Sequence, residues 1–115
     1  MLPSINPTTT AAWKKLEQHA ASMKKMSMRE LFSNDSSRFS KFSMCLDEIV
    51  LDYSKNLITE ETIQLLIQLA EECKVADAIK AMFNGNKINA TEKRAVLHTA
   101  LRNFSDSPVY EEGKD

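Results

Sequence analysis

The residues that could carry acid–base or nucleophilic chemistry are few and lie far apart in this chain. His is the side chain whose unperturbed pKa is nearest neutrality, and the sequence holds two, His19 and His98. His98 is the better candidate, because it lies beside the apolar stripe of a predicted helix, whereas His19 is predicted at the surface. A lone helical His is more often a hydrogen-bonded structural group. We therefore interpret His98 as structural, with a small His98-dependent enzyme as an alternative.

Other site chemistries also lack a matching pattern. Cys45 and Cys73 are far apart and form no CxxC motif, so we expect two buried thiols in a reducing cytoplasm rather than a metal site. Lys87 precedes Thr91 in the nearest approach to a phosphate-binding loop, but the glycines that such a loop needs are absent. The acidic residues of the predicted helices are expected to be solvated: Glu60, Glu61, Glu71 and Glu72. The sequence predicts no catalytic, substrate-binding, cofactor-binding or metal-ligating residue.

Length and composition favour one globular, mostly helical segment. The chain has 115 residues, of which 43% are hydrophobic and 27% charged, and it contains only two glycines and three prolines. Its net charge of −1 provides no field that would attract nucleic acid or an anionic membrane. No apolar run approaches the roughly 20 residues of a membrane span. We expect neither a nucleic-acid partner nor a membrane.

The N-terminal half carries clear helix-start signals. Asn6 before Pro7 can cap a helix whose first position tolerates proline. Ser27 and Glu30 have the spacing of a capping box. A later stretch of β-branched and aromatic residues favours strands. The predicted elements of this half are helices at about 7–25, 28–33 and 36–42 and a hairpin at about 43–54.

The C-terminal half predicts three further helices. Thr59 can cap a helix with two acidic residues in its first turn and an apolar face broad enough to pack on two sides. Gly85 is suited to end the next helix, and Thr91 to cap the last one. The predicted elements are helices at about 59–74, 75–84 and 91–103, a strand at 108–111 and a closing turn at Gly113–Asp115. The expected fold is therefore mostly α with one small β-hairpin (α+β), in a single segment over 1–115.

The stretch GNKINATEKRAVLHTALRN, residues 85–103, closely resembles a segment of the glucose-6-phosphate isomerase (phosphoglucose isomerase) family. In that family the runs K-I-N, T-E, R-A-V-L-H and A-L-R-N recur in this order. The stretches INPTTTAAW, RELF, RFSKFS, LDYSKN, ITEET, AMFNG and GKD also match, so the resemblance covers essentially the whole chain. The chain departs from the family at Asn86, where Glu is usual, and at Phe104, where a basic residue is usual.

The resemblance implies an enzyme of glycolysis and gluconeogenesis. Members interconvert glucose 6-phosphate and fructose 6-phosphate through an enediol, without a cofactor, and a glutamate moves the proton. They are cytoplasmic homodimers whose two αβα sugar-isomerase subdomains hold the sugar phosphate. The family's catalytic groups match no position of this sequence. Arg94 and His98 therefore belong to scaffold.

These implications give two expectations about the chain itself. The first is an N-terminal helical fragment of the isomerase that lacks the catalytic subdomains, is inactive alone and exposes apolar surface, above all on the helix at 59–74 and the strand at 108–111. The alternative is a stand-alone helical protein-interaction module that keeps this fold without the chemistry.

Overall fold

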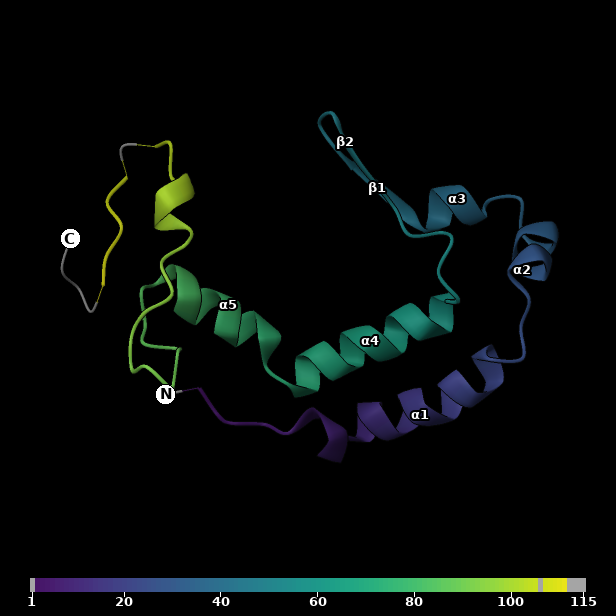
Figure 1. Ribbon diagram of the computed structural model, residues 1–115, viewed down its shortest axis with the longest axis horizontal. Helices are drawn as coiled ribbons and strands as arrows, with labels where there is room; N and C mark the ends of the chain where they lie inside the picture. Colours follow the sequence, from purple (N-terminus) through teal and green to yellow (C-terminus); the bar gives the residue numbers. More distant parts are fainter. Residues whose placement is uncertain (1, 106, 112–115) are drawn as a thin grey trace. The chain divides into compact units, whose positions relative to one another are not determined.

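The computed structural model describes residues 2–105 and 107–111, and it is mostly helical with one small hairpin (Figure 1). The fold class expected from the sequence is thus confirmed. Its contacts fall into two compact units, residues 8–69 and residues 1–7 with 70–115, where the sequence predicted one segment. The elements are η1 (Pro7–Thr9), α1 (Ala11–Met23), α2 (Met28–Asn34), α3 (Arg38–Lys41), β1 (Ser43–Leu46), β2 (Ile49–Asp52), α4 (Glu60–Glu72), α5 (Val75–Phe83) and η2 (Ala100–Arg102).

The first long helix begins later than the sequence predicted. Pro7 opens a short 3-10 turn, and the α-helix starts at Ala11. Thr10 is the cap, because its backbone is extended and its hydroxyl accepts a hydrogen bond from the backbone N–H of Trp13 at 3.2 Å. Thr10, three residues before Trp13, therefore caps the helix in place of Asn6.

The second helix has the predicted capping box. The backbone N–H of Ser27 donates to the carboxylate of Glu30 at 3.3 Å, and the two residues cap each other. The helix that follows is shorter than predicted: α3 covers only four residues, Arg38–Lys41, within the expected 36–42.

The predicted hairpin is confirmed, with a two-residue turn. β1 and β2 pair antiparallel, Ser43 opposite Asp52 and Leu46 opposite Ile49. Asp47 occupies the turn with a positive φ of 49°, which Asp tolerates better than most residues. The turn therefore forms without the glycine that such hairpins usually use.

Two separate helices replace what could have been one long helix in the C-terminal half. Lys74 has a left-handed backbone, with φ 57°, and it separates α4 from α5. Thr59 caps α4 as predicted: its hydroxyl accepts from the N–H of Thr62 at 3.4 Å, and its own N–H donates to the Thr62 hydroxyl at 2.9 Å. The predicted breaks near residues 59, 74 and 84 are therefore confirmed.

The predicted helix at 91–103 is wrong. The side chain of Asn89 accepts from the backbone N–H of Glu92, and its backbone N–H donates to the carbonyl of Arg94. Lys93, inside this turn, has φ 54°, which is incompatible with a helix. A short Asn side chain competes with helical bonding in this way. The apolar stripe is only partly covered, since Val96, Leu97 and Ala100 are half-buried and Leu101 is 81% exposed. Only the 3-10 turn η2 remains helical.

Three further expectations fail or fall outside the described residues. Residues 107–110 have no regular structure, so the predicted strand at 108–111 is not formed. The closing turn at Gly113–Asp115 lies outside the described residues. The buried thiol expected at Cys45 is also wrong, since Cys45 lies exposed on the hairpin, while Cys73 is half-buried.

The buried apolar side chains among the described residues are small in number for a chain of this length. In residues 8–69 they are Ala12, Met23, Leu31, Phe42 and Leu65, and in the other unit Ala81. Three buried side chains are polar or charged: Arg38, Ser54 and Thr62. Polar contacts therefore hold together much of the interior of the 8–69 unit.

Gly85 is where the backbone leaves α5 for the following loop. It is buried, its φ is +67°, and a Cβ there would lie 1.9 Å from the carbonyl oxygen of Tyr110. We expect Gly85→Ala to lower the free energy of unfolding by about 2 kcal/mol, from left-handed strain and the displaced segment. Urea denaturation followed by circular dichroism measures this. Asn84→Ala, at an exposed neighbour with negative φ, is the control, and equal stability of the two variants would contradict the expectation.

Candidate functional site

The most enclosed charged group among the described residues is the guanidinium of Arg38. The residue is 3% exposed, and it projects from α3 toward the loop between β2 and α4. Its Nε donates to the carbonyl of Ser54 at 2.8 Å, Nη1 to that of Ile58 at 3.1 Å and Nη2 to that of Asn56 at 2.8 Å. The three carbonyls of one short loop are thus gathered on one planar fork.

Two aromatic rings complete the surroundings of this cation. The guanidinium carbon lies 4.8 Å from the ring centroid of Phe42 and 5.5 Å from that of Phe32. Carbonyl oxygens and ring faces both stabilise a buried positive charge. Because the fork is already bonded to backbone carbonyls, Arg38 serves to hold the loop and is poorly placed to bind an anionic ligand.

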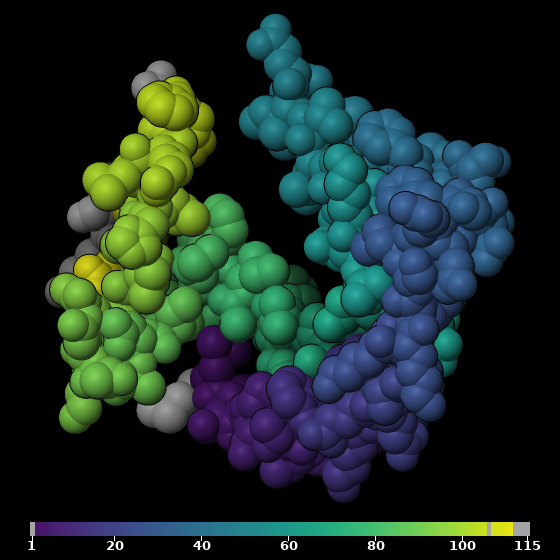
Figure 2. All heavy atoms as spheres, turned by 45° about the vertical axis from the view of Figure 1, so that its right-hand side comes forward, coloured from purple at the N-terminus to yellow at the C-terminus, as the bar shows by residue number. Residues whose placement is uncertain are grey.

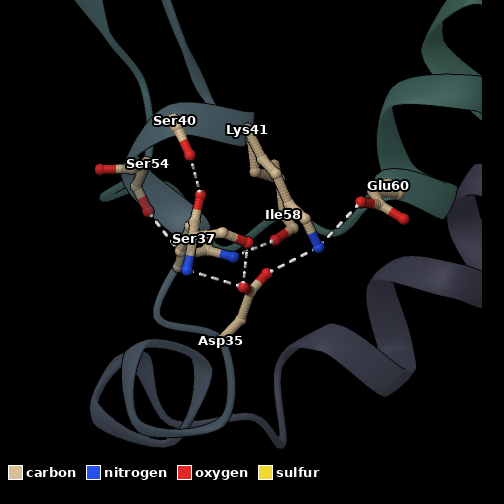
Figure 3. Close-up of polar contacts among 8 residues, drawn as sticks. Asp35, Ser37, Ser40, Lys41, Ser54, Ile58 and Glu60 are labelled. Carbon is tan, nitrogen blue, oxygen red and sulfur yellow. Dashed lines mark hydrogen bonds and ion pairs between the residues drawn. The ribbon is translucent and has the colours of Figure 1, made fainter.

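A second, exposed polar network lies beside this fork (Figure 3). Asp35 accepts from the hydroxyl and backbone N–H of Ser37 and pairs with the ammonium of Lys41 at 3.0 Å. Lys41 also reaches Glu60 at 3.2 Å, at the first residue of α4. The Ser37 hydrogen bond and the Lys41 ammonium lower the pKa of Asp35 to about 2, and the two carboxylates raise the pKa of Lys41. The pairing keeps both groups charged near neutral pH.

His19 takes part in a contact that the sequence did not predict. Its side chain is only 10% exposed, although a surface position was expected, because α1 lies against the start of α4. Its Nε2 is 2.6 Å from the hydroxyl of Thr62, and its Nδ1 is 3.5 Å from the carboxylate of Glu61. Two open grooves border the histidine, one of about 460 Å³ and one of about 230 Å³.

The order carboxylate, imidazole, hydroxyl is also the order used in nucleophilic catalysis. Here the Thr62 hydroxyl oxygen already accepts from the backbone N–H of Thr59, and Thr62 is 9% exposed. The hydroxyl therefore belongs to the cap of α4, and Thr62 also lines the smaller of the two grooves. We interpret His19 as a tether between α1 and α4, which a helical pattern alone could not reveal because the partners are 43 residues apart.

The candidate residues chosen from the sequence do not come together. His98 is exposed in an irregular segment, where its backbone carbonyl accepts from Arg102 at 3.1 Å, so the predicted place beside a helical stripe is wrong. Arg94 forms an ion pair with Glu92 in the turn after Asn89. Thr91 lies in the same turn and caps no helix. The four glutamates expected to be solvated are all exposed, as predicted.

Residues 2–105 and 107–111 also lack the features of a metal site or a membrane span. This part of the chain holds no group of three or more His, Cys, Asp or Glu side chains that could bind a metal ion. None of its helices combines the length and apolar character that crossing a membrane requires.

A comparison with protein families now decides the assignment of the chain. The model for a family described as phosphoglucose isomerase matches residues 52–115, more than half of the sequence. The chain belongs to the phosphoglucose isomerase family. This is a family of aldose–ketose isomerases that act on sugar phosphates. The matched region includes the stretch 85–103 that carries the resemblance, whereas the motifs before residue 52 lie outside the match.

The family match also covers the loop that Arg38 holds. Ser54, Asn56 and Ile58 lie within the matched region, and Arg38 lies before it. The segment before residue 52 therefore supports the conformation of the matched one through a buried side chain.

Replacing Arg38 should reveal how much the loop depends on it. We expect Arg38→Met to lower the free energy of unfolding by about 3 kcal/mol, because three carbonyls lose their charged donor. Arg38→Lys should recover only part of this, since an ammonium cannot reproduce the planar fork. Urea denaturation provides the measurement. Arg29→Met, at an exposed position of α2, is the control, and a loss no larger for Arg38→Met than for this control would disprove the role.

The Asp35 network predicts a specific pH dependence. The folded pKa of Asp35, about 2, lies below its ordinary value of 3.8. The stabilisation is therefore complete above the ordinary value and is lost as the pH falls through about 2. We expect a carbon-13 NMR titration of the Asp35 carboxyl to have its midpoint near 2, moving toward 3.8 in Lys41→Met. Lys24→Met, an exposed change elsewhere, should leave the midpoint in place. A midpoint near 3.8 in the unaltered chain would refute the pairing.

Proposed function

We propose that this chain is the scaffold portion of a glucose-6-phosphate isomerase and supplies none of its catalytic groups. The observation that carries the proposal is the family match at residues 52–115, together with the lack of a chemically poised group in the described structure. The buried Arg38 is bonded to backbone carbonyls, and His19 is bonded to a helix cap. Proton transfer between the two carbons of a sugar phosphate would then depend on residues outside this chain.

The exposed apolar positions of the helices support a scaffold role. On α4, Leu65 is buried while Leu66 and Ile67 are 45% and 53% exposed, so the helix has the predicted second apolar side. On α5, three apolar side chains at four-residue spacing form an exposed stripe: Val75 (41%), Ile79 (49%) and Phe83 (61%). Contiguous exposed apolar surface is typical of protein contact sites. The proposal assigns these surfaces to contact with the sugar-isomerase subdomains of the enzyme.

The same proposal implies a substrate, a pathway, a cellular compartment and an oligomeric state for the enzyme. The substrate would be glucose 6-phosphate or fructose 6-phosphate, in glycolysis and gluconeogenesis, within the cytoplasm. The enzyme would act as a homodimer and would need no cofactor, nucleic acid or membrane. The stand-alone interaction module is the second candidate, and the same exposed stripe on α5 favours it. The two differ in whether the stripe contacts isomerase subdomains or another protein.

The first test is an activity measurement on the 115-residue chain. We expect no conversion of fructose 6-phosphate above the blank in an assay coupled to glucose-6-phosphate oxidation. Circular dichroism on the same sample confirms that the chain is helical, so that inactivity is not the result of unfolding. Turnover above the blank, lost in His98→Ala, would instead support the small-enzyme alternative.

The second test asks whether the chain completes an isomerase. A family member from which the region corresponding to this chain has been deleted is mixed with the chain, and isomerase activity is recorded. We expect activity to return, and Ile79→Asp to lower it about tenfold by placing a charge on the α5 stripe. Lys80→Asp, at the adjacent exposed position, is the matched control. Recovery unaffected by Ile79→Asp would argue against the stripe as a contact surface.

A further inference from the structure

The end of α5 places an exposed asparagine, Asn84, directly before a buried glycine, Gly85. An asparagine followed by glycine can lose its side-chain ammonia without an enzyme. The backbone nitrogen of the glycine attacks the side-chain carbonyl carbon, and a residue without a Cβ leaves that approach open. Asn84 is the one asparagine in the sequence that precedes glycine. The chain therefore carries the reacting groups of a deamidation site at this helix end.

The reaction needs only water besides these two residues. The Gly85 nitrogen, after losing its proton, forms a bond to the side-chain carbonyl carbon of Asn84. That carbon releases its amide nitrogen, which takes up a proton and leaves as ammonia, and a cyclic imide remains. Water then adds to one of the two imide carbonyl carbons and breaks its bond to the nitrogen. The product is aspartate, or isoaspartate in which the main chain runs through the former side-chain carbons.

The folded end of α5 keeps the reacting atoms apart. Asn84 has φ −84° and ψ 6°, and a ψ near zero places the Gly85 nitrogen beside the backbone nitrogen of Asn84 and away from its side chain. The Gly85 N–H donates to the carbonyl of Met82 at 3.2 Å, and the N–H of Asn86 donates to that of Ala81 at 2.9 Å. These two bonds close the helix end. Because attack requires close and aligned reacting atoms, the closed end protects Asn84.

The products of the reaction do not fit the closed helix end. Gly85 packs so tightly that a Cβ there would overlap the carbonyl oxygen of Tyr110. Figures 1 and 2 show the end of α5 and the loop after it (green) beside the later part of the same unit (yellow-green to yellow). Isoaspartate lengthens the main chain just before this contact. Both products also place a carboxylate at the C-terminal end of a helix, where the free carbonyls already carry partial negative charge.

We propose that Asn84–Gly85 is a self-modification site that makes opening of the α5 end permanent. The closed end prevents imide formation, opening permits it, and the carboxylate products oppose closure. The rate of modification then follows the fraction of time that this end of the helix is open. The inference goes beyond the proposed scaffold role and does not rest on it, because it requires only the local structure around one helix end.

Peptide mass spectrometry of the 115-residue chain tests the site and its protection. The chain is kept in a mildly alkaline buffer, with and without concentrated urea, and the remaining amide is measured at each asparagine. In urea, Asn84 should react about tenfold faster than Asn89 and Asn103, whose following residues have side chains. Without urea, Asn84 should react about tenfold more slowly than in urea. Equal rates in either comparison would overturn the proposal.

A pair of glycine variants tests whether the controlling motion is local. Lys80→Gly, at an exposed position in the last turn of α5, weakens the helix end without altering the reacting dipeptide. We expect Asn84 to react several-fold faster in this variant, relative to the rate of the same variant in urea. Lys15→Gly makes the same change at an exposed position of α1 and should leave the relative rate unaltered. Equal acceleration by both variants would overturn local control.

Amide hydrogen exchange tests whether the modified end stays open. Anion exchange separates the modified chain by its added negative charge. The amides of Gly85 and Asn86 should exchange about tenfold faster in that form, because their hydrogen bonds to α5 are lost. Asn84→Gln, whose longer side chain forms the corresponding imide much more slowly, is carried through the same incubation and should keep slow exchange. Unchanged exchange in the modified chain would show that the end closes again and would overturn the proposal.

Discussion

The 8–69 unit depends on one buried cation, the guanidinium of Arg38. The chain passes from β2 to α4 through a loop. The carbonyls of Ser54, Asn56 and Ile58 in this loop turn inward toward the guanidinium. Buried carbonyls are costly unless a donor meets them, and no regular structure supplies donors in such a loop. A planar fork with several donors meets three carbonyls at once, and the rings of Phe32 and Phe42 cover its faces. The start of α4, and with it the His19 contact, is placed by this arrangement.

The hydrogen bonds between Arg38 and this loop explain how a unit with few buried apolar residues keeps a defined structure. Arg38, Ser54 and Thr62 are its buried polar residues, and each has hydrogen-bond partners. The apolar residues that remain are distributed over outward-facing surfaces. Those on α4 and α5 lie on helices within the family match, which favours contact with an isomerase scaffold. Those on the hairpin lie before the match and form a separate apolar face.

The His19 contact shows why a catalytic-looking arrangement need not be catalytic. Glu61, His19 and Thr62 stand in the order of a charge-assisted nucleophile, yet the Thr62 oxygen also accepts from a backbone N–H at a helix start. A hydroxyl that caps a helix is held in place by that hydrogen bond. The same chemistry that could activate a nucleophile here joins two helices.

Local signals in the sequence determined the parts of the structure that depend on neighbouring residues. The Ser27–Glu30 capping box, the Thr59 cap, the hairpin at 43–54 and the helix stop near Gly85 all follow from short-range hydrogen bonding and backbone preference. The ordered motifs of 85–103 likewise indicated the family without any knowledge of shape.

Tertiary structure alone decided the rest. The helical pattern of 91–103 gave way to the short-range turn at Asn89 where tertiary packing left the apolar stripe only partly covered, with Leu101 81% exposed. The Arg38–Ser54 hydrogen bond joins residues 16 positions apart, and the His19–Thr62 contact joins residues 43 positions apart. No local pattern specifies which distant groups will meet. Short-range preferences depend on neighbouring residues and can be predicted from the sequence. Burial and long-range hydrogen bonds form only when distant parts of the chain come together in the folded structure.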